Sequence, residues 1–261
     1  MTDLRHQQVV RYITPLREGG SLPALTEADD GFKYVLKFRG AGHGTKALIA
    51  ELIGGEVARA LGFRVPELVF LDLDEDFGRT EPDEEIQDLL RASHGENLGM
   101  HFLSGAVTVD PYVNKIDGKL ASAIVWLDAF LANVDRTVQN TNMLVWNDEV
   151  WLIDHGASLY FHHAGTDPEQ AALSPFPYVK SHALLRKADC IEAVDKEMRQ
   201  KITPRTLKKI VSMIPDSWLS WEGDEKTPAE HRQMYETFLT TRLANSSIFV
   251  KRAVDERNAL I

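Results

Sequence analysis

The stretch between residues 133 and 156 constrains the fold of this chain more than any other. It reads NVDRTVQNTNMLVWNDEVWLIDHG, and it contains two apolar runs, at 143–146 and 150–153. Between the runs stand Asn147 and Asp148, a pair of residues that favours the tight turn of a β-hairpin. The segment therefore predicts two antiparallel strands, which return the chain to the point where the first strand began.

Oxygen-bearing side chains flank the predicted hairpin. Asp135 and Asn140 precede it, and Asp154 follows it. Because a hairpin brings its two ends together, we expect Asn140 and Asp154 to lie close in space, with Asp135 one short loop away. Phosphoryl transfer needs such a cluster, since it depends on positioning and on charge neutralisation by Mg²⁺, which binds hard oxygen ligands. One carboxylate would orient or deprotonate the attacking hydroxyl, while the amide and the other carboxylate would hold the metal.

The segments on either side of the hairpin support this interpretation. Residues 120–133 predict a helix with a broad buried face, which leads directly into Asp135 and would give the site a rigid base. After the hairpin, His155, His162 and His163 raise the alternative of a zinc site. The helical H-E-x-x-H spacing is absent, however, and the neighbouring oxygen ligands favour magnesium.

The first part of the chain combines strand patterns with two glycine-rich stretches. Strands are predicted at 9–13 and 32–38, and a Gly-Gly-Ser loop at 19–21 lies between them. Glycine allows backbone N–H groups to approach phosphates closely, although this loop matches neither G-x-G-x-x-G nor the Walker A sequence. A second stretch at 39–46 joins a strand to a helix, and it is an equal candidate because helix N-termini favour anions.

Lys37 stands inside an apolar strand pattern. Its side chain faces either water or a cleft, where it would contact nucleotide phosphates. A helix is predicted at 47–62, with Gly62 suited to its C-cap. Glu51 lies among the apolar residues of this helix and is the predicted partner of Lys37.

Composition bounds the class of protein. The 261 residues are 44% hydrophobic, enough for one large domain or two lobes around a shared cleft. Lys and Arg number 29 against 39 Asp and Glu, and the net charge of -10 disfavours direct nucleic-acid binding. Cys190 is the single cysteine, which excludes an internal disulfide. Residues 1–8 are polar and no apolar run is long enough to cross a membrane, so we expect a cytoplasmic protein with no membrane partner.

Taken in order, these features resemble the protein-kinase-like superfamily, most closely its HipA-like and phosphoinositide-kinase-like branches. The Asp-Arg-x-x-x-Asn sequence at 135–140 is similar to the phosphoinositide-kinase catalytic loop. The segment at 51–66, an acidic residue followed by an A-x-x-L-G-x-x-V-P pattern, is similar to the HipA helix that precedes the hinge region. The resemblance covers most of the chain, and it covers the C-terminal helices only in general character.

The resemblance implies an α+β fold of the protein-kinase-like, bilobal type. A small β-rich N-lobe would span residues 1–104, and a mainly helical C-lobe would span residues 105–261. ATP would lie in the cleft between them. Met100 and Phe102, in a run broken by glycine that would suit a strand leading into the hinge, are predicted to contact the adenine.

The resemblance also implies a role for each site residue. The catalytic group would consist of Asp135 as base, Lys37 on the phosphates, and Glu51 orienting Lys37. Mg²⁺ would be held by Asp154 and by an amide. Either Asn140 or Asn142 could supply that amide. The phosphate-binding loop would consist of Gly19, Gly20 and Ser21.

The resulting prediction is an ATP- and Mg²⁺-dependent phosphotransferase of the HipA-like type, which acts on a protein Ser/Thr hydroxyl. A small-molecule kinase is the alternative acceptor class, and a nucleotide-binding pseudokinase with a regulatory role is the alternative without chemistry. Two positions depart from ordinary protein kinases: Asn133 and Val134 replace the histidine before the catalytic aspartate, and His155 stands where the D-F-G motif has phenylalanine. All the expected polar residues are present, which favours catalysis.

Overall fold

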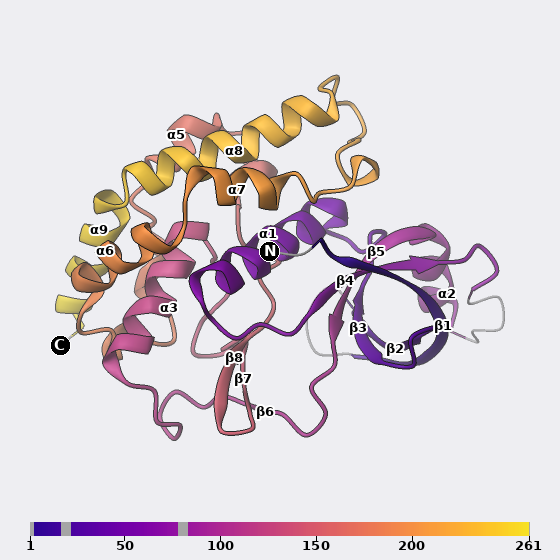
Figure 1. Cartoon of the computed structure of the whole chain (residues 1–261), viewed down its shortest axis with the longest axis horizontal. Helices are drawn as coiled ribbons and strands as arrows, with labels where there is room; N and C mark the ends of the chain where they lie inside the picture. Colours follow the sequence, from indigo (N-terminus) through magenta and orange to yellow (C-terminus); the bar gives the residue numbers. More distant parts are fainter. Residues whose placement is uncertain (1–2, 17–21, 78–82, 261) are drawn as a thin grey trace.

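Strands of the first part of the chain close into a barrel at one end of the molecule (Figure 1). The computed structural model describes residues 3–16, 22–77 and 83–260. The barrel strands are β1 (Arg5–Pro15), β2 (Ala24–Ala28), β3 (Lys33–Lys37), β4 (Leu68–Leu73) and β5 (Gly95–His101). Their order is β1-β2-β3-β5-β4, and β1 pairs with β4 in parallel, whereas the other neighbours are antiparallel.

Alternation along β3 separates the inside of the barrel from the outside. Tyr34 and Leu36 are fully buried within a small hydrophobic cluster that fills the barrel and is completed by the helix α2 (Glu84–Ala92). Because successive side chains of a strand point to opposite faces, Val35 and Lys37 point out of the barrel. The predicted strand at 32–38 is confirmed, and its register decides where Lys37 lies.

The helix α1 (Gly44–Leu61) lies between the barrel and the remaining helices (Figure 1). It ends as predicted at Gly62, whose φ of 94° is left-handed and whose N–H bonds back to the last turn. It contacts β5 on one side and the helices α6 and α7 on the other. Both parts of the molecule therefore pack against the helix that carries Glu51.

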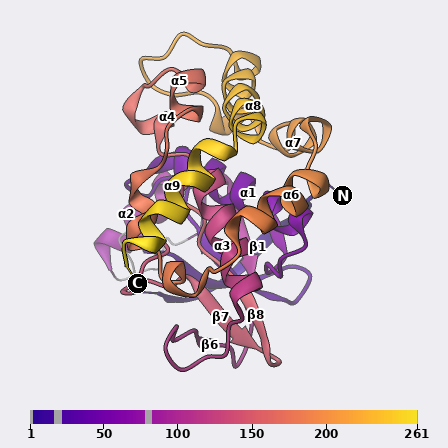
Figure 2. The ribbon, with the colours of Figure 1, turned by 90° about the vertical axis from the view of Figure 1, so that its left-hand side faces the viewer.

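The second part of the chain is mainly helical and surrounds α3 (Gly118–Leu131), which is buried throughout its length after the first turn. Figure 2 views the molecule from this helical end, where α9 lies in front of α3 and contacts it. The other helices are α4 (Phe161–Ala164), α5 (Pro168–Ala172), α6 (Ile191–Lys201), α7 (Pro204–Val211), α8 (Pro228–Ala244) and α9 (Ser247–Asn258). Short 3-10 turns are η1 (Pro177–Ser181), η2 (Leu185–Lys187) and η3 (Asp216–Trp218).

The predicted hairpin is present. Its strands are β7 (Met143–Trp146) and β8 (Glu149–Leu152), and Asn147 and Asp148 make the turn with φ of 50° and 61°. Positive φ at both central residues is the geometry of a type I′ turn, which suits the twist of paired strands. Met143 pairs with Leu152, so the end of the hairpin returns to its start. A short strand not predicted from the sequence, β6 (Val107–Thr108), pairs with β7.

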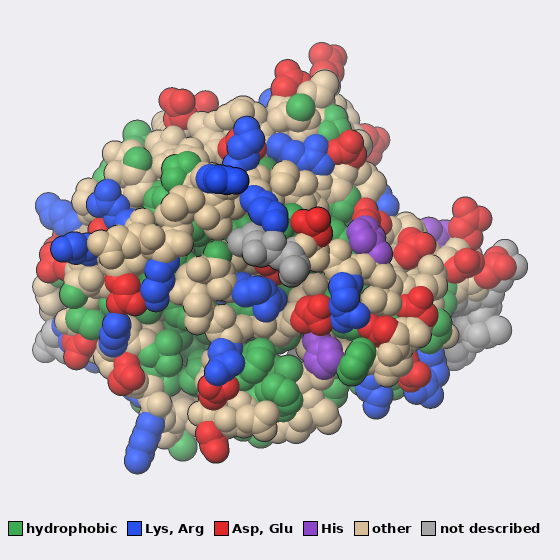
Figure 3. Space-filling model, in the orientation of Figure 1, with side chains coloured by type: hydrophobic (Ala, Val, Ile, Leu, Met, Phe, Trp, Pro, Cys, Tyr) green, Lys and Arg blue, Asp and Glu red, His purple; other side chains and the backbone are tan. Residues whose placement is uncertain are grey.

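The mixture of strands and helices confirms the predicted α+β class. A second, larger hydrophobic cluster runs from α1 and the outer faces of β4 and β5 through α3 to the C-terminal helices. Basic and acidic side chains are interspersed over the face shown in Figure 3. Within the described ranges, no helix combines the length and the apolar character needed to cross a membrane.

Candidate active site

A single lysine joins three elements at the edge of the barrel. Nζ of Lys37 on β3 lies 2.6 Å from Oε2 of Glu51 on α1 and 2.6 Å from Oδ1 of Asp154, just after β8. Burial alone would lower the pKa of Lys37, but the charges of Asp154 and Glu51 outweigh it and raise the pKa above its ordinary value. The positive charge of Lys37 in turn lowers the pKa of Asp154. Lys37 therefore faces the site and not bulk water.

Asp135 lies next to this cluster and is oriented by two amides. Nδ2 of Asn140 and Nδ2 of Asn142 both donate to Oδ2 of Asp135, at 2.7 Å and 3.2 Å. Because both amides use the same oxygen, Oδ1 is left for another partner. Burial, together with the charge of Asp154, raises the pKa of Asp135, although the amide hydrogen bonds act to lower it. A raised pKa makes this carboxylate a better proton acceptor than an ordinary aspartate.

The ends of the hairpin bring these residues together. The N–H of Ile153 donates to the carbonyl oxygen of Asn142 at 3.1 Å, directly across the ends of the two strands. Asn142 and Asp154 both have left-handed φ, 49° and 54°. Asn and Asp tolerate this conformation better than most residues, and its occurrence at both ends of the hairpin shows that the backbone is constrained there. The sequence-based expectation that the two ends of the hairpin meet is confirmed.

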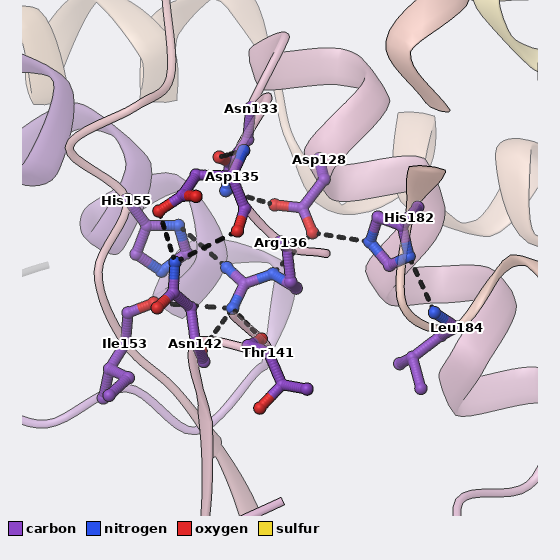
Figure 4. A network of polar contacts seen from close by, with 10 residues as sticks. All are labelled: Asp128, Asn133, Asp135, Arg136, Thr141, Asn142, Ile153, His155, His182 and Leu184. Carbon is purple, nitrogen blue, oxygen red and sulfur yellow. Dashed lines mark hydrogen bonds and ion pairs between the residues drawn. The ribbon is translucent and has the colours of Figure 1, made fainter. Parts of the chain in front are cut away.

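A buried arginine, to which the sequence analysis assigned no role, holds the two ends of the hairpin together (Figure 4). Arg136 is 1% exposed, and its Nη1 donates to the carbonyl oxygens of Asn142 and Ile153, which belong to the two ends of the hairpin. Its Nε pairs with Oδ2 of Asp128 on α3 at 2.6 Å. The loop at 135–140, the hairpin and α3 are therefore fixed to one guanidinium group.

Asp128 is the centre of a second set of contacts in Figure 4. Nε2 of His182 lies 2.9 Å from its Oδ2, and Nδ2 of Asn133 donates to its Oδ1 at 2.9 Å. Burial would raise the pKa of Asp128, but the charge of Arg136 and the bond to His182 lower it, so the carboxylate stays ionised. The signal in the sequence was present: Asp128 is the one acid in an otherwise apolar helix pattern, and Arg136 follows Asp135 directly.

His155 anchors the end of the hairpin on α1. The ring is fully buried, and Nδ1 lies 3.5 Å from Nη2 of Arg136. A Cβ placed on Gly54 of α1 would lie 2.5 Å from Cβ of His155, so only glycine permits this approach. Burial and the charge of Arg136 lower the pKa of His155 to about 3, and the imidazole is therefore neutral at physiological pH.

These side chains open onto a cavity of about 630 Å³, a size that suits a small-molecule ligand or cofactor. The wall includes Lys37, Asp135, Asn140 and Asp154, whereas Glu51 and Asn142 stand behind them as hydrogen-bond partners. The rest of the wall is formed by Pro23, Phe38, Ala41, His43, Gly44, Ala47, Leu48, Val134, Gly156, Ala157, Tyr160 and His163. The second glycine-rich stretch, at 39–46, thus contributes to the cavity.

The structure does not bring every predicted contact to this cavity. Met100 lies in β5, is 6% exposed and packs in the larger hydrophobic cluster, and the N–H of Phe102 bonds to the carbonyl of Lys33. Neither is among the residues that line the cavity, so their contact with adenine stays a prediction. The predicted loop of Gly19, Gly20 and Ser21 lies outside the described residues.

The donor set fits a hard divalent cation. Asp154 supplies a carboxylate, and the amide nitrogen of Asn140 is bonded to Asp135, which leaves its oxygen for a ligand. Such a set is completed by phosphate and water oxygens. In residues 3–16, 22–77 and 83–260, no three His, Cys, Asp or Glu side chains are grouped so that they could hold a metal ion. The three histidines considered for zinc therefore do not form such a group.

Comparisons with known proteins bear on the family and the fold of the chain. A protein-family model described as HipA-like kinase matches residues 9–248. No curated protein sequence matches the chain significantly. Among solved structures, the Helicobacter pylori proinflammatory kinase CtkA is similar, with a TM-score of 0.59 and 14% identity over 97% of this chain and 99% of that one. The Golgi casein kinase with Mn/ADP bound has a TM-score of 0.49 and 14% identity, over 99% of this chain and 75% of that one. The fold is kinase-like, as predicted from the sequence.

Proposed function

Because the chain belongs to the HipA-like kinase family, we propose that it transfers the γ-phosphate of ATP, with Mg²⁺, to a Ser or Thr hydroxyl of a protein. The barrel part and the helical part act as the two lobes, and the cavity between them takes the nucleotide. One observation carries the proposal. The lysine of β3 pairs at once with Glu51 and Asp154, and Lys37 and Asp154 line one cavity together with Asp135.

Each polar residue in the cavity wall or directly behind it has a role in this proposal. Glu51 holds the ammonium of Lys37 in position, and Lys37 contacts the phosphates. Asp154 and the oxygen of Asn140 hold the metal, since Asn140 lines the cavity and Asn142 does not. Asn142 instead orients Asp135. When bound, Mg²⁺ supplies neutralisation of the phosphate charge.

Asp135 acts as the catalytic base. Its Oδ2 is fixed by the two amides, and its Oδ1 accepts the proton of the acceptor hydroxyl. The raised pKa of Asp135 brings its basicity closer to that needed for proton transfer at neutral pH.

The remaining nucleotide contacts are assigned by type of interaction. Backbone N–H groups near Gly44, at the start of α1, contact phosphates together with the loop of Gly19, Gly20 and Ser21, because helix N-termini and glycine-rich backbone both favour anions.

A pseudokinase is the main competing function, and an isotope experiment separates the two. With γ-labelled ATP and a mixed protein acceptor, the wild type should transfer phosphate, and Asp135→Ala should reduce the rate at least about a hundredfold, or about 3 kcal/mol, while retaining nucleotide binding. Asp154→Ala should also lose transfer, and its nucleotide affinity should no longer depend on Mg²⁺. Asp88→Ala, an exposed acid on α2, is the matched control and should behave as the wild type.

Two results would change the assignment. Tight nucleotide binding with no transfer or hydrolysis above the level of Asp135→Ala identifies a pseudokinase. Transfer to a metabolite mixture but not to proteins identifies a small-molecule kinase with the same catalytic group.

A further inference from the structure

A second cavity, of about 590 Å³, lies beside the first, and His163 forms part of the wall of both. The second cavity is enclosed by the start of α1, by α4 and the loop after it, by residues 221–226, and by the first turns of α8. Figure 2 shows α4, α5 and α8 close together at one side of the molecule, and α5 contacts α8 extensively. A ligand here would therefore sit next to the site of phosphoryl transfer.

Lys46 contributes an ammonium group to the wall of this second cavity. Its Nζ donates to the carbonyl oxygen of His162 at 2.7 Å and lies 4.3 Å from the centre of the Trp221 ring. No carboxylate among the described residues is within ion-pair distance of it. Lys46 also belongs to the first turn of α1, which has no side-chain cap and no acidic residue. The helix dipole adds positive potential at that end, so the location favours an anion.

The acids in the same wall already have partners. Asp167 is the N-cap of α5, and Glu230 completes a capping box with Thr227 at the start of α8. Oδ1 of Asp224 accepts from the N–H of Lys226 at 3.0 Å and pairs with its ammonium at 3.4 Å. These carboxylates are held by local contacts, whereas Lys46 has no acidic partner within the described part of the chain.

His162 independently indicates a ligand. The side chain lines the second cavity and is 4% exposed. Its Nδ1 lies 3.0 Å from the hydroxyl of Tyr235, whereas its buried Nε2 has no hydrogen-bond partner among the described residues. A buried polar atom without a partner costs free energy, which a bound polar group would recover.

We propose that the second cavity binds the acceptor polypeptide, and that Lys46 and Nε2 of His162 together receive a carboxylate side chain close to the acceptor Ser or Thr. This inference rests on the proposed function, because it takes the acceptor to be a protein. With the Tyr235 hydroxyl donating to Nδ1, Nε2 carries the ring hydrogen and donates to the carboxylate. The kinase accordingly prefers acidic sequences around the phosphorylated residue.

Measurements of peptide binding test the preference for acidic sequences without relying on catalysis. Fluorescence anisotropy would compare three labelled peptides that have a central serine flanked by glutamate, glutamine or lysine. The glutamate peptide should bind about tenfold more tightly than the glutamine peptide, and Lys46→Met should remove that preference, a loss of about 1.4 kcal/mol. Lys46→Arg keeps the charge and should keep the preference. Lys180→Met removes an exposed lysine outside both cavities and should bind as the wild type.

The outcomes separate the inference from the function. Equal binding of glutamate and glutamine peptides, an unchanged preference in Lys46→Met, or tightest binding of the lysine peptide would each overturn the acidic preference. Circular dichroism and thermal melting of Lys46→Met show whether it is folded, and Lys46→Arg provides an independent reading of the charge. If phosphate transfer fails while the acidic peptide still binds through Lys46, then only the catalytic proposal is wrong.

Discussion

At the scale of single residues, the charges of the site are only partly compensated within the chain. Lys37 holds Glu51 and Asp154 with one ammonium group, while Asp135 is held by neutral amides. The cluster therefore has more negative than positive groups, which favours a divalent cation. His155 contributes no charge, because burial and Arg136 lower its pKa to about 3. Neutrality of this ring is a condition of the folded state, and it makes stability depend on pH.

The contribution of His155 to stability should be lost on acidification. The pKa of His155 is 6.5 as a reference value and about 3 in the folded chain, so the unfolded state binds the proton more readily. The contribution is complete above pH 6.5 and falls by about 1.4 kcal/mol per pH unit as the pH drops from 6.5 towards 3. Urea unfolding of the wild type and of His155→Phe, measured from pH 7.5 to 4.5, should therefore give a difference that shrinks on acidification by roughly that slope. Parallel stability curves would contradict this account.

At the scale of elements, the hairpin and the loop at 135–140 form one unit. β7 and β8 bring Asn142 opposite Ile153, and Arg136 binds the carbonyl oxygens of both. The pair of Arg136 with Asp128 then fixes this unit to the buried helix α3. A loop of irregular backbone is held in this way by a helix, and the proposed role of Asp135 as a base requires such precise positioning.

The same unit shows how much the sequence could predict. The turn at Asn147 and Asp148 and the return of Asp154 followed from local patterns, because strand alternation and turn preferences depend on neighbouring residues. Arg136 could not be assigned in this way, since its partners are carbonyl oxygens whose positions depend on the tertiary fold. Gly54 was equally hidden, because its role is the close approach of His155 from a distant segment.

Asp128→Asn should destabilise the protein and displace the loop at 135–140. The substitution keeps the shape but leaves the guanidinium of Arg136 buried without a counter-charge, and breaking one partner of a buried pair costs about 3–5 kcal/mol. Asp195→Asn is the matched control. Asp195 lies on α6 and accepts a hydrogen bond at 2.8 Å from Trp126, which lies on α3 like Asp128, but Asp195 is partly exposed. This substitution should cost about 1 kcal/mol. Chemical denaturation measures both. Equal losses in the two variants would show that Arg136 does not depend on Asp128.

At the scale of the whole molecule, one segment of the helical part reaches back to the barrel. Trp218 in η3 is fully buried, its ring packs edge-on to Phe70 of β4 at 5.6 Å, and its Nε1 donates to the carbonyl of Glu96 in β5 at 2.8 Å. The carbonyl of Trp218 accepts from the hydroxyl of Thr45 in the first turn of α1. One residue thus joins the barrel, α1 and the helical part, since its ring contacts β4 and β5 and its backbone carbonyl contacts α1.

Trp218→Ala should therefore uncouple the two parts of the molecule as well as destabilise them. Removing a buried tryptophan costs about 3–5 kcal/mol, and here the lost contacts are those that join the barrel to the helices. We expect calorimetry to show two unfolding transitions where the wild type has one, and faster hydrogen exchange in β4 and β5. Trp146→Ala is the control, because Trp146 is partly exposed on the hairpin and bonds to the carbonyl of Ser104 at 3.1 Å. For that control we expect a smaller loss of stability and a single unfolding transition. The same behaviour in Trp218→Ala would contradict the prediction. It would mean that the larger hydrophobic cluster, to which α1 contributes, is sufficient to keep the two parts together.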